Sequence, residues 1–220
     1  MADEPCIVLH TRPYRESSLI VSLLSLRHGR VDLVARGVRG GRRGRALQPF
    51  VLLRAGWSGR SSLGTLTVFE TETQHWFKGN VLASAFYLAE LTVRLVGERE
   101  PQPRLFAGLK WSLENIEYDL ELVLRSFEKL LLEELGYGLD FSLDTDGKPL
   151  DDQMLYRLTL DRGFSRGGGD FSGRLLKRIG QEDFSERSVR LLAKRVLREA
   201  LSHHLGPKPL VSRRLLVNRA

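Results

Sequence analysis

The first 75 residues consist of short apolar runs separated by polar or glycine-containing turns, a pattern typical of β-strands. The runs are rich in β-branched and aromatic side chains, and the last of them alternates apolar with polar positions. We expect five strands, over residues 7–11, 18–26, 31–36, 50–57 and 63–73. Five short strands in so few residues predict a small closed or partly open β-barrel.

From residue 80 onward the apolar positions recur every three or four residues, which places them on one face of a helix. The first such stripe contains Leu82, Phe86 and Val93. Five helices are expected, over residues 81–96, 103–113, 118–135, 172–179 and 186–205. Ser172 and Ser185 stand at the start of the last two helices, where we expect them to act as N-caps.

Residues 139–171 follow neither pattern, because aspartate, glycine and proline interrupt the apolar runs. A hairpin is expected between residues 155–160 and 164–166, across a turn at residues 161–163. The predicted fold class is therefore α+β. We expect a barrel over residues 1–79, the core of a helical domain over 80–138, an irregular segment with a hairpin over 139–171, and basic C-terminal helices over 172–220 that pack on the helical domain.

Charge is unevenly distributed along the 220 residues, although the net charge is only +7. Residues 1–79 carry 12 lysines and arginines against 6 acids, residues 80–186 carry 13 against 20, and residues 187–220 carry 9 against 1. Two basic segments thus flank an acidic one. Segregated positive charge attracts polyanions such as nucleic acids, so we expect the N-terminal barrel to be an OB-fold.

The densest charge lies in residues 36–45, between the third and fourth predicted strands. This decapeptide contains five arginines, four glycines and no acid. Glycine favours loop conformations, and five permanently charged guanidinium groups repel one another unless a polyanion neutralises them. The alternative is a solvated, poorly ordered surface loop. The position of the decapeptide between two barrel strands favours an anion-binding site.

The candidate nucleic-acid contacts of the barrel are nine arginines that face a single acid, Asp32, between residues 27 and 60. They are Arg27, Arg30, Arg36, Arg39, Arg42, Arg43, Arg45, Arg54 and Arg60. OB-folds bind single strands by combining such cations with aromatic side chains on which bases stack. Tyr14, Phe50 and Trp57 are available for stacking. The alternative for Phe50 and Trp57 is a place in the barrel core.

The last long helix carries a second group of cations. Arg187, Arg190, Lys194 and Arg198 share one face because they are spaced by three and four residues. The alternative is an ordinary amphipathic helix with a solvated charged side. Four cations with few acids exceed what solubility requires, so we expect a second nucleic-acid contact here.

The sequence contains no recognisable catalytic motif. The glycine-rich decapeptide lacks the Gly-Lys-Ser/Thr of a phosphate-binding loop, and no Ser/His/Asp arrangement can be read. Cys6 is the single cysteine, which excludes an intrachain disulfide and a cysteine zinc site. No apolar run approaches the ~20 residues of a membrane span. We expect a cytoplasmic protein that is not an enzyme and has no cofactor or bound metal.

Five motifs occur in a characteristic order along the chain. They are VARGVR at residues 34–39, ALQPF at 46–50, FYLAEL at 86–91, RSFEKLLLEELGY at 125–137 and GPKPLVSR at 206–213. Together they resemble the RecO family of bacterial recombination mediators over essentially the whole chain. Each motif is loose by itself, but five in order make the resemblance specific.

The resemblance implies an N-terminal OB-fold and a mainly helical remainder, in agreement with the patterns above. It also implies that the protein binds single- and double-stranded DNA, anneals complementary strands without ATP, and acts with RecR on strands coated by SSB so that RecA can load. Such a protein would be associated with the nucleoid. Many family members hold a four-cysteine zinc site where this chain has residues 139–171, which contain no cysteine. The chain therefore resembles a zinc-less branch, in which packing alone would hold this segment.

The resemblance further suggests a site for the acidic, apolar C-terminal tail of SSB. Arg125 matches a position associated with that contact, and Arg94, Arg104 and Lys110 are further candidates for the same groove. The alternative for Arg125 is an ion pair within its own helix, with Glu121 or Glu128. The rival function that charge alone leaves open is an RNA-binding OB-fold protein of translation or ribosome assembly.

Overall fold

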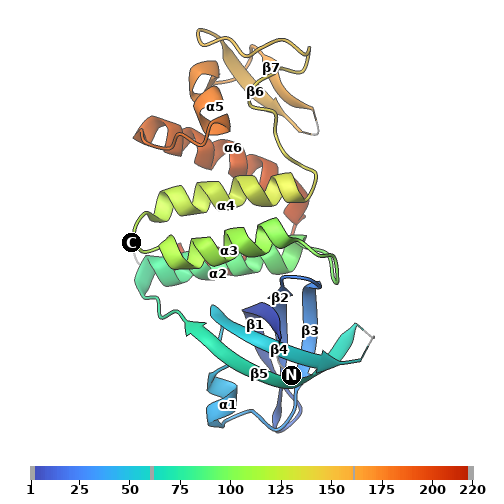
Figure 1. The fold of residues 1–220 in the computed structure, drawn as a ribbon. Coiled ribbons are helices and arrows are strands. Elements are labelled where there is room, and N and C mark those ends of the chain that lie inside the picture. The colour runs from blue at the N-terminus through green and yellow to red at the C-terminus, as the bar shows by residue number, and fades with distance from the viewer. Residues whose placement is uncertain (1–2, 60–61, 161, 218–220) are drawn as a thin grey trace. The chain divides into compact units, whose positions relative to one another are not determined.

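The computed structural model describes residues 3–59, 62–160 and 162–217 (Figure 1). The chain folds into two compact units, Met1–Tyr118 together with Leu210–Ala220, and Asp119–Pro209. Both helices and sheets are present, which confirms the predicted α+β class. The predicted domain boundaries at residues 79, 138 and 171 remain a prediction. Of the helices within residues 80–138, two belong to the first compact unit and one to the second.

The first unit begins with five strands that close into a barrel in the order β1-β2-β3-β5-β4. These strands are Glu4–Tyr14, Ser18–Ser25, Gly29–Ala35, Val51–Ser58 and Leu63–Gln74. Neighbouring strands are antiparallel except β3 and β5, which run parallel, and β4 closes on β1. The predicted five-stranded, OB-like barrel is confirmed.

Side chains that alternate along the strands fill the barrel. In β3, for example, Val31, Leu33 and Ala35 are buried while the residues between them are half-buried. Nearly every residue of β2 is buried, because Ile20 and Leu24 on its second face are covered as well as the residues of its inner face. This double burial explains why residues 18–26 read as a continuous apolar run rather than an alternating one.

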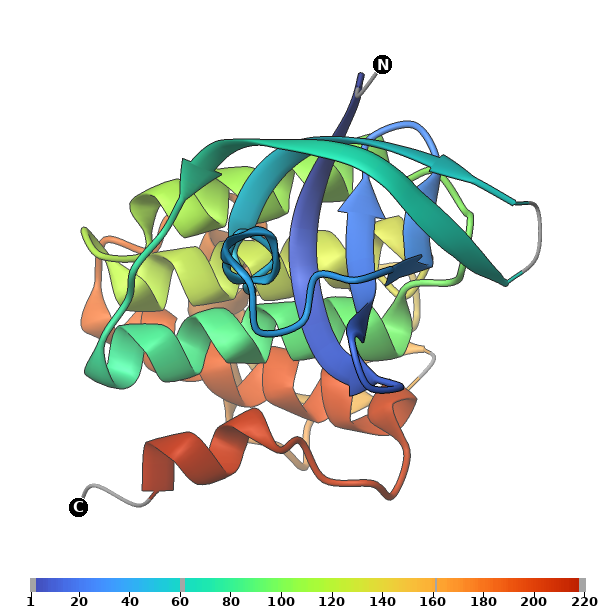
Figure 2. The ribbon, with the colours of Figure 1, turned by 90° about the horizontal axis from the view of Figure 1, so that it is seen from below.

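The connection from β3 to β4 crosses one end of the barrel and closes it (Figure 2). It contains a short helix, α1 (Arg42–Arg45), where the sequence predicts only loop. Val38 and Leu47, before and after this helix, are 4% and 0% exposed and belong to the barrel core. Gly44 is required between them, because a Cβ there would lie 2.3 Å from the carbonyl oxygen of Val38.

The first unit is completed by α2 (Gly79–Leu95), α3 (Pro103–Asn115) and α7 (Ser212–Val217). α2 packs against β1 and against α7. The ring of Phe50 lies 4.9 Å from that of Phe86 on α2 and 5.7 Å from that of Phe77. Phe50 is therefore buried, as the alternative interpretation held, but it packs against α2 and Phe77 and is not a member of the barrel core.

α7 is an element that the sequence pattern did not predict. It begins where the carboxylate of Glu90 on α2 accepts hydrogen bonds from the backbone N–H groups of Val211 and Ser212 and from the Ser212 hydroxyl. This contact brings the end of the chain back to the first unit.

The second unit contains α4 (Leu120–Glu134), α5 (Gly173–Gly180), α6 (Arg187–Leu205) and a small sheet of order β7-β6-β8. The strands are β6 (Leu155–Thr159), β7 (Gly163–Arg166) and β8 (Phe171–Ser172). β6 and β7 form the predicted hairpin, and Asp161 in its turn lies outside the described residues. Ser172 is the N-cap residue of α5, as predicted, but its side chain makes no capping hydrogen bond. The predicted N-cap at Ser185 is wrong, because Glu186 is the N-cap residue of α6 and the Ser185 hydroxyl donates to Asp183 in the preceding turn.

The segment 139–171 is held by an ion pair as well as by packing. The buried carboxylate of Asp144 accepts a 2.6 Å hydrogen bond from Nε of Arg166 and others from the backbone N–H groups of Asp146 and Lys148. The aromatic side chains buried in this part of the chain are Phe141, Tyr156, Phe164 and Phe171. Packing alone, as the zinc-less resemblance implies, is thus an incomplete description.

Leu47→Ala tests the closure of the barrel end. The change removes a fully buried side chain from a site that the barrel strands cannot refill, so we expect a loss of ~2–5 kcal/mol in the free energy of unfolding. Chemical denaturation followed by tryptophan fluorescence measures it. The exposed neighbour is the control, because Gln48→Ala should cost less than ~0.5 kcal/mol. Equal costs for the two variants would contradict the role of Leu47.

Candidate nucleic-acid interface

The arginine-rich connection has a defined backbone path. Gly37 and Gly40 have φ of +64° and +80°, the left-handed region that glycine reaches without strain. The N–H of Arg39 donates to the carbonyl of Ser17 at 2.9 Å. The Thr11 hydroxyl donates to the carbonyl of Leu47 at 2.6 Å. The glycines that make residues 36–45 look disordered in the sequence therefore serve turns and close packing.

The five arginines of this connection, Arg36, Arg39, Arg42, Arg43 and Arg45, are all exposed. None of the ion pairs between described residues involves them. The guanidinium of Arg39 donates to the carbonyl oxygens of Arg15 and Glu16, at 3.1 and 3.5 Å. The guanidinium carbon of Arg43 lies 5.3 Å from the ring centroid of Phe69 on β5, within the range of a cation–π contact. The connection is positively charged, and residues 36–45 contain no acid that could neutralise it.

A hollow of about 680 Å³ lies beside this connection. Its lining comes from the β1–β2 turn, the end of β3 and the first residues of β5, and includes Tyr14, Arg15 and Arg36. The guanidinium carbon of Arg15 stands 5.2 Å from the centroid of the Tyr14 ring. OB-folds bind oligonucleotides with their β1–β2 and β4–β5 loops. The hollow is lined by the β1–β2 turn and by the first residues of β5. Arg60, predicted to contact nucleic acid from the β4–β5 loop, lies outside the described residues.

Two other candidate arginines of the barrel are paired with its acids. Nε of Arg54 lies 2.7 Å from Glu72, and Nε of Arg27 lies 2.6 Å from Glu4. Burial raises the pKa of Glu4, but hydrogen bonds from Ser25 and from the backbone and guanidinium of Arg27 outweigh it and lower the pKa below its ordinary value. Arg27 and Arg54 therefore have less uncompensated charge to offer a polyanion than the arginines of the connection.

Arg30 has a packing role. Its side chain is only 13% exposed, and its guanidinium donates to the carbonyl of Val96 at 3.0 Å and pairs with Glu98 at 3.3 Å. Gly29, beside it, has a positive φ, and a Cβ there would lie 2.0 Å from the carbonyl oxygen of Glu100. The β2–β3 turn thus packs tightly against the segment that follows α2. Because of this contact, Arg30 differs from the exposed candidate arginines.

On α6 the structure divides the four predicted cations. Arg187, Lys194 and Arg198 are exposed. The guanidinium of Arg190 instead donates to both carboxylate oxygens of Asp119, at 2.9 and 2.7 Å. Asp119 is the N-cap of α4, so Arg190 ties α6 to the start of α4. The exposed face of α6 therefore carries three of the predicted cations.

The predicted tail-binding residues fall into different environments. Arg125 is 5% exposed, and its Nη1 lies 2.9 Å from the buried carboxylate of Glu128. This ion pair within α4 is the alternative that the sequence left open. Lys110 lies 3.8 Å from Glu114, and Arg94 and Arg104 are on α2 and α3. Arg125 belongs to the second unit and the other three to the first, so their common groove remains a prediction.

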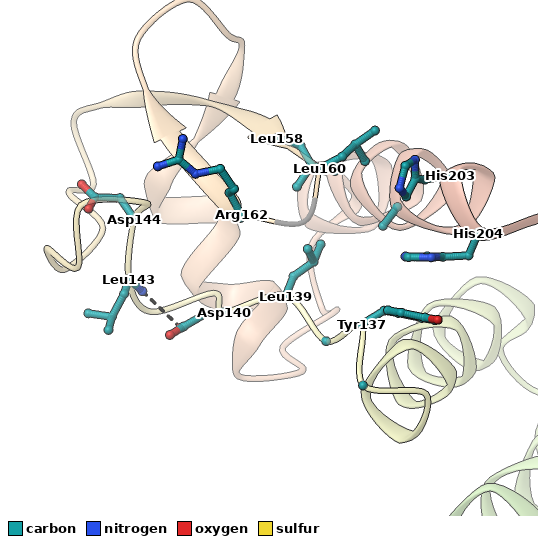
Figure 3. A pocket seen from close by; sticks show the side chains of 14 residues that line it. Tyr137, Leu139, Asp140, Leu143, Asp144, Leu158, Leu160, Arg162, His203 and His204 are labelled. Atoms are coloured by element: carbon teal, nitrogen blue, oxygen red, sulfur yellow. Dashed lines mark hydrogen bonds between the residues drawn. The ribbon is translucent and has the colours of Figure 1, made fainter.

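A separate hollow of about 510 Å³ lies within the second unit (Figure 3). The rings of Tyr137 and His204 stack at one side of it, 3.7 Å apart and 12° from parallel. Its acids are engaged by their own surroundings, Asp140 by the backbone N–H of Ser142 and Asp144 by Arg166. Within residues 3–59, 62–160 and 162–217, no three His, Cys, Asp or Glu side chains gather as a metal site would require. We assign this hollow no chemistry.

Two residues of the interface were missed in the sequence. Arg15 follows a strand as an isolated turn residue, and Phe69 is one apolar position of an alternating strand, so neither stands out locally. Tyr14 is half-buried in the hollow, and Trp57 packs partly buried against the barrel core. A signal for Arg15 would have been its place in the β1–β2 loop of a predicted OB-fold.

Comparison with known proteins identifies the family. The model described as "Recombination protein O N terminal" matches residues 1–75, and "Recombination protein O C terminal" matches residues 77–214. The chain belongs to the recombination protein O family. The boundary between the two matches falls between the end of β5 and the start of α2.

Relatives in the recombination protein O family match over nearly their whole length. The DNA repair protein RecO of Pseudomonas aeruginosa (strain PAO1) is 39% identical over 225 residues, 99% of this chain and 96% of that protein. Those of Stutzerimonas stutzeri and Coxiella burnetii are 40% and 41% identical, covering 98% of this chain and 93% and 98% of the relatives. The resemblance seen in the sequence motifs is confirmed.

None of the helices in the described ranges combines the length and apolar character needed to cross a bilayer.

Arg190→Ala tests the packing role of this arginine. Losing the two hydrogen bonds to Asp119 should lower the free energy of unfolding by ~1 kcal/mol, a modest value because both side chains are partly exposed. Arg187→Ala, one helical turn earlier and exposed, is the matched control and should be close to neutral. Thermal unfolding of the two variants measures the difference. Indistinguishable midpoints would show that the Asp119 contact does not stabilise α6.

Proposed function

We propose that this protein binds single-stranded DNA on its barrel and anneals complementary strands without nucleotide hydrolysis. The observation that carries the proposal is the set of exposed arginines, free of acidic partners among the described residues, on the connection between β3 and β4. Membership of a family of DNA repair proteins supports DNA as the polyanion. The hollow beside Arg36 is lined by the β1–β2 turn, one of the loops that OB-folds use for oligonucleotides, which supports a single strand as its form.

Binding of this kind depends on phosphate charge. Arg36, Arg42, Arg43 and Arg45 would displace counterions from the strand, which gives sequence-independent and salt-sensitive affinity. The planar groups available for base contact are Tyr14 and the Phe69 ring that lies beneath Arg43. Stacking on such rings tolerates every base, which suits a protein that must act on any sequence.

Annealing requires a second surface for the complementary strand. We place it on the exposed face of α6, with Arg187, Lys194 and Arg198. Cations on more than one face lower the repulsion between two polyanions, because each strand is screened by its own set of charges. No covalent chemistry is needed for this step, so the protein would act without a catalytic centre.

The same protein would serve as a recombination mediator in a RecF-type repair pathway. We propose that with RecR it acts on strands coated by SSB and so promotes loading of RecA, in the cytoplasm at the nucleoid. Arg125 is the proposed contact for the acidic tail of SSB. Its ion pair with Glu128 would compete with the tail carboxylate, so tail binding there requires that Glu128 give way. Arg94, Arg104 and Lys110 would supply further charge on the first unit.

Changing Arg42, Arg43 and Arg45 together to Ala tests the barrel surface. Loss of three phosphate contacts should weaken single-strand binding roughly tenfold or more and reduce the slope of log affinity against log salt by about 2. Fluorescence anisotropy with a labelled oligo-dT over a range of salt concentrations measures both quantities.

The control for this triple variant is Arg27→Ala combined with Arg54→Ala. Those two arginines are paired with Glu4 and Glu72, so their loss should leave the salt slope nearly unchanged. An unaltered slope in the triple variant would remove the connection from the interface. Equal affinity for RNA and DNA, with no acceleration of strand annealing, would instead favour an RNA-binding protein of translation or ribosome assembly.

Changing Arg187, Lys194 and Arg198 to Gln tests the second surface. Annealing of complementary strands should slow roughly tenfold because the second polyanion is no longer steered to the protein. Affinity for one strand alone should change by less than about twofold if the barrel supplies it. Arg195→Gln on the same helix is the control, since Arg195 is paired with Asp170 at 2.6 Å. An unchanged annealing rate in the triple variant would rule out α6.

A further inference from the structure

Trp76 presents a large aromatic surface to solvent. It is 75% exposed, compared with 42% for Trp111, while Trp57 is partly buried against the barrel core. Single exposed apolar residues are common on protein surfaces. What distinguishes Trp76 is how firmly its backbone is supported.

The residues on both sides of Trp76 are anchored. Phe77 is buried and its ring packs 5.7 Å from that of Phe50. The ring of His75 lies against Phe77, 5.5 Å away and 11° from parallel. The indole of Trp76 therefore projects from a fixed support rather than from a long loose loop. A pre-positioned aromatic ring loses little conformational entropy when a ligand stacks on it.

The position of Trp76 relates it to the arginine surface. β5 carries Phe69, which lies beneath Arg43, and ends at Gln74, which pairs with Val51 immediately after the arginine-rich connection. Seven residues separate Phe69 from Trp76, roughly 23 Å in an extended chain. A strand of a few nucleotides, within the site size of an OB-fold, would span this distance.

The surroundings of Trp76 favour stacking over phosphate contact. The carboxylates of Glu114 and Glu117 lie close enough to act on His75, although burial still holds the pKa of His75 below its ordinary value. Exposed Lys78 is the nearby cation along the chain. With two acids near and one lysine, the segment is unsuited to binding phosphate by charge. A contribution from Trp76 should therefore be independent of salt.

We propose that Trp76 is a base-stacking residue that makes the barrel surface prefer single-stranded to double-stranded DNA. This inference rests on the proposed DNA-binding function. An unpaired base can lay its face on the indole, whereas the bases of a duplex are already stacked and turn only their edges outward. The arginines bind either form by phosphate charge, so the discrimination depends on stacking, to which Trp76 adds a more exposed ring than Tyr14 or Phe69.

Trp76→Ala tests the inference directly. Affinity for oligo-dT should fall roughly tenfold, the effect of losing one base–aromatic stack, while the salt slope and the affinity for a duplex of equal length stay unchanged. Trp76→Phe should recover most of the loss because a smaller aromatic face remains. Trp111→Ala is the matched control and should leave both affinities unaltered. Thermal unfolding should show that Trp76→Ala is folded, since the removed ring is mostly in solvent.

A second measurement reads the contact itself. In a variant with Trp57→Phe and Trp111→Phe, Trp76 is the remaining tryptophan, and oligo-dT should quench its fluorescence while the duplex should not. Unchanged oligo-dT affinity in Trp76→Ala, or equal weakening for single strand and duplex, would overturn this inference alone. Absence of DNA binding by the unaltered protein would overturn the proposed function and this inference together.

Discussion

Parallel pairing of β3 with β5 is the constraint on which the barrel and its charged surface both depend. Parallel neighbours cannot be joined by a hairpin, so the chain must leave β3, cross the barrel end, form β4 and only then return as β5. Val38 and Leu47 make that crossing favourable because they complete the barrel core from its open end. The arginines between them are held outward by the same burial. The burial of Val38 and Leu47 thus both closes the barrel and exposes the arginines between them. This explains how a segment rich in glycine and like charge can have a well-defined backbone.

The arginines that the sequence groups together do two physically different things. Arg27, Arg30 and Arg54 face acids or carbonyls of their own unit and contribute to the fold. The arginines of residues 36–45 have no acidic partner among the described residues and keep their charge available, although Arg39 donates to the carbonyls of Arg15 and Glu16. The division follows from position, since a residue on a strand or in a tight turn between strands lies beside the acids of neighbouring strands, whereas one on the crossing faces solvent. Counting cations in the sequence therefore overstates the number available to a polyanion. Exposure without an acidic partner is the more useful criterion for choosing candidate contacts.

Sequence patterns predicted the barrel strands, the hairpin and most helices because the apolar period that defines each of them is local. The same patterns missed α1, α7 and β8, which are too short to show a period. The sequence patterns also could not identify contacts between residues that are far apart along the chain. The contacts of Arg190 with Asp119 and of Arg30 with Val96 join residues 71 and 66 positions apart, so both arginines looked like free surface charge. The expected cap at Ser185 failed because Asp183, two residues earlier, captures its hydroxyl. Fold class and the arginine-rich crossing were thus readable, whereas the roles of individual arginines required the three-dimensional pairing.

An annealing protein must hold each strand firmly enough to align it and loosely enough to release the product. Exposed guanidinium groups meet this requirement, because each phosphate contact is weak and screened by salt while their sum is large. A deep, shape-specific pocket would bind one strand more tightly but would retain it. Contacts that depend on an unpaired base add a further property, since they are lost when the base finds its complement. On this surface, charge would gather the strands and stacking would favour them only until they pair, so formation of the duplex would itself weaken the hold of the protein on its product.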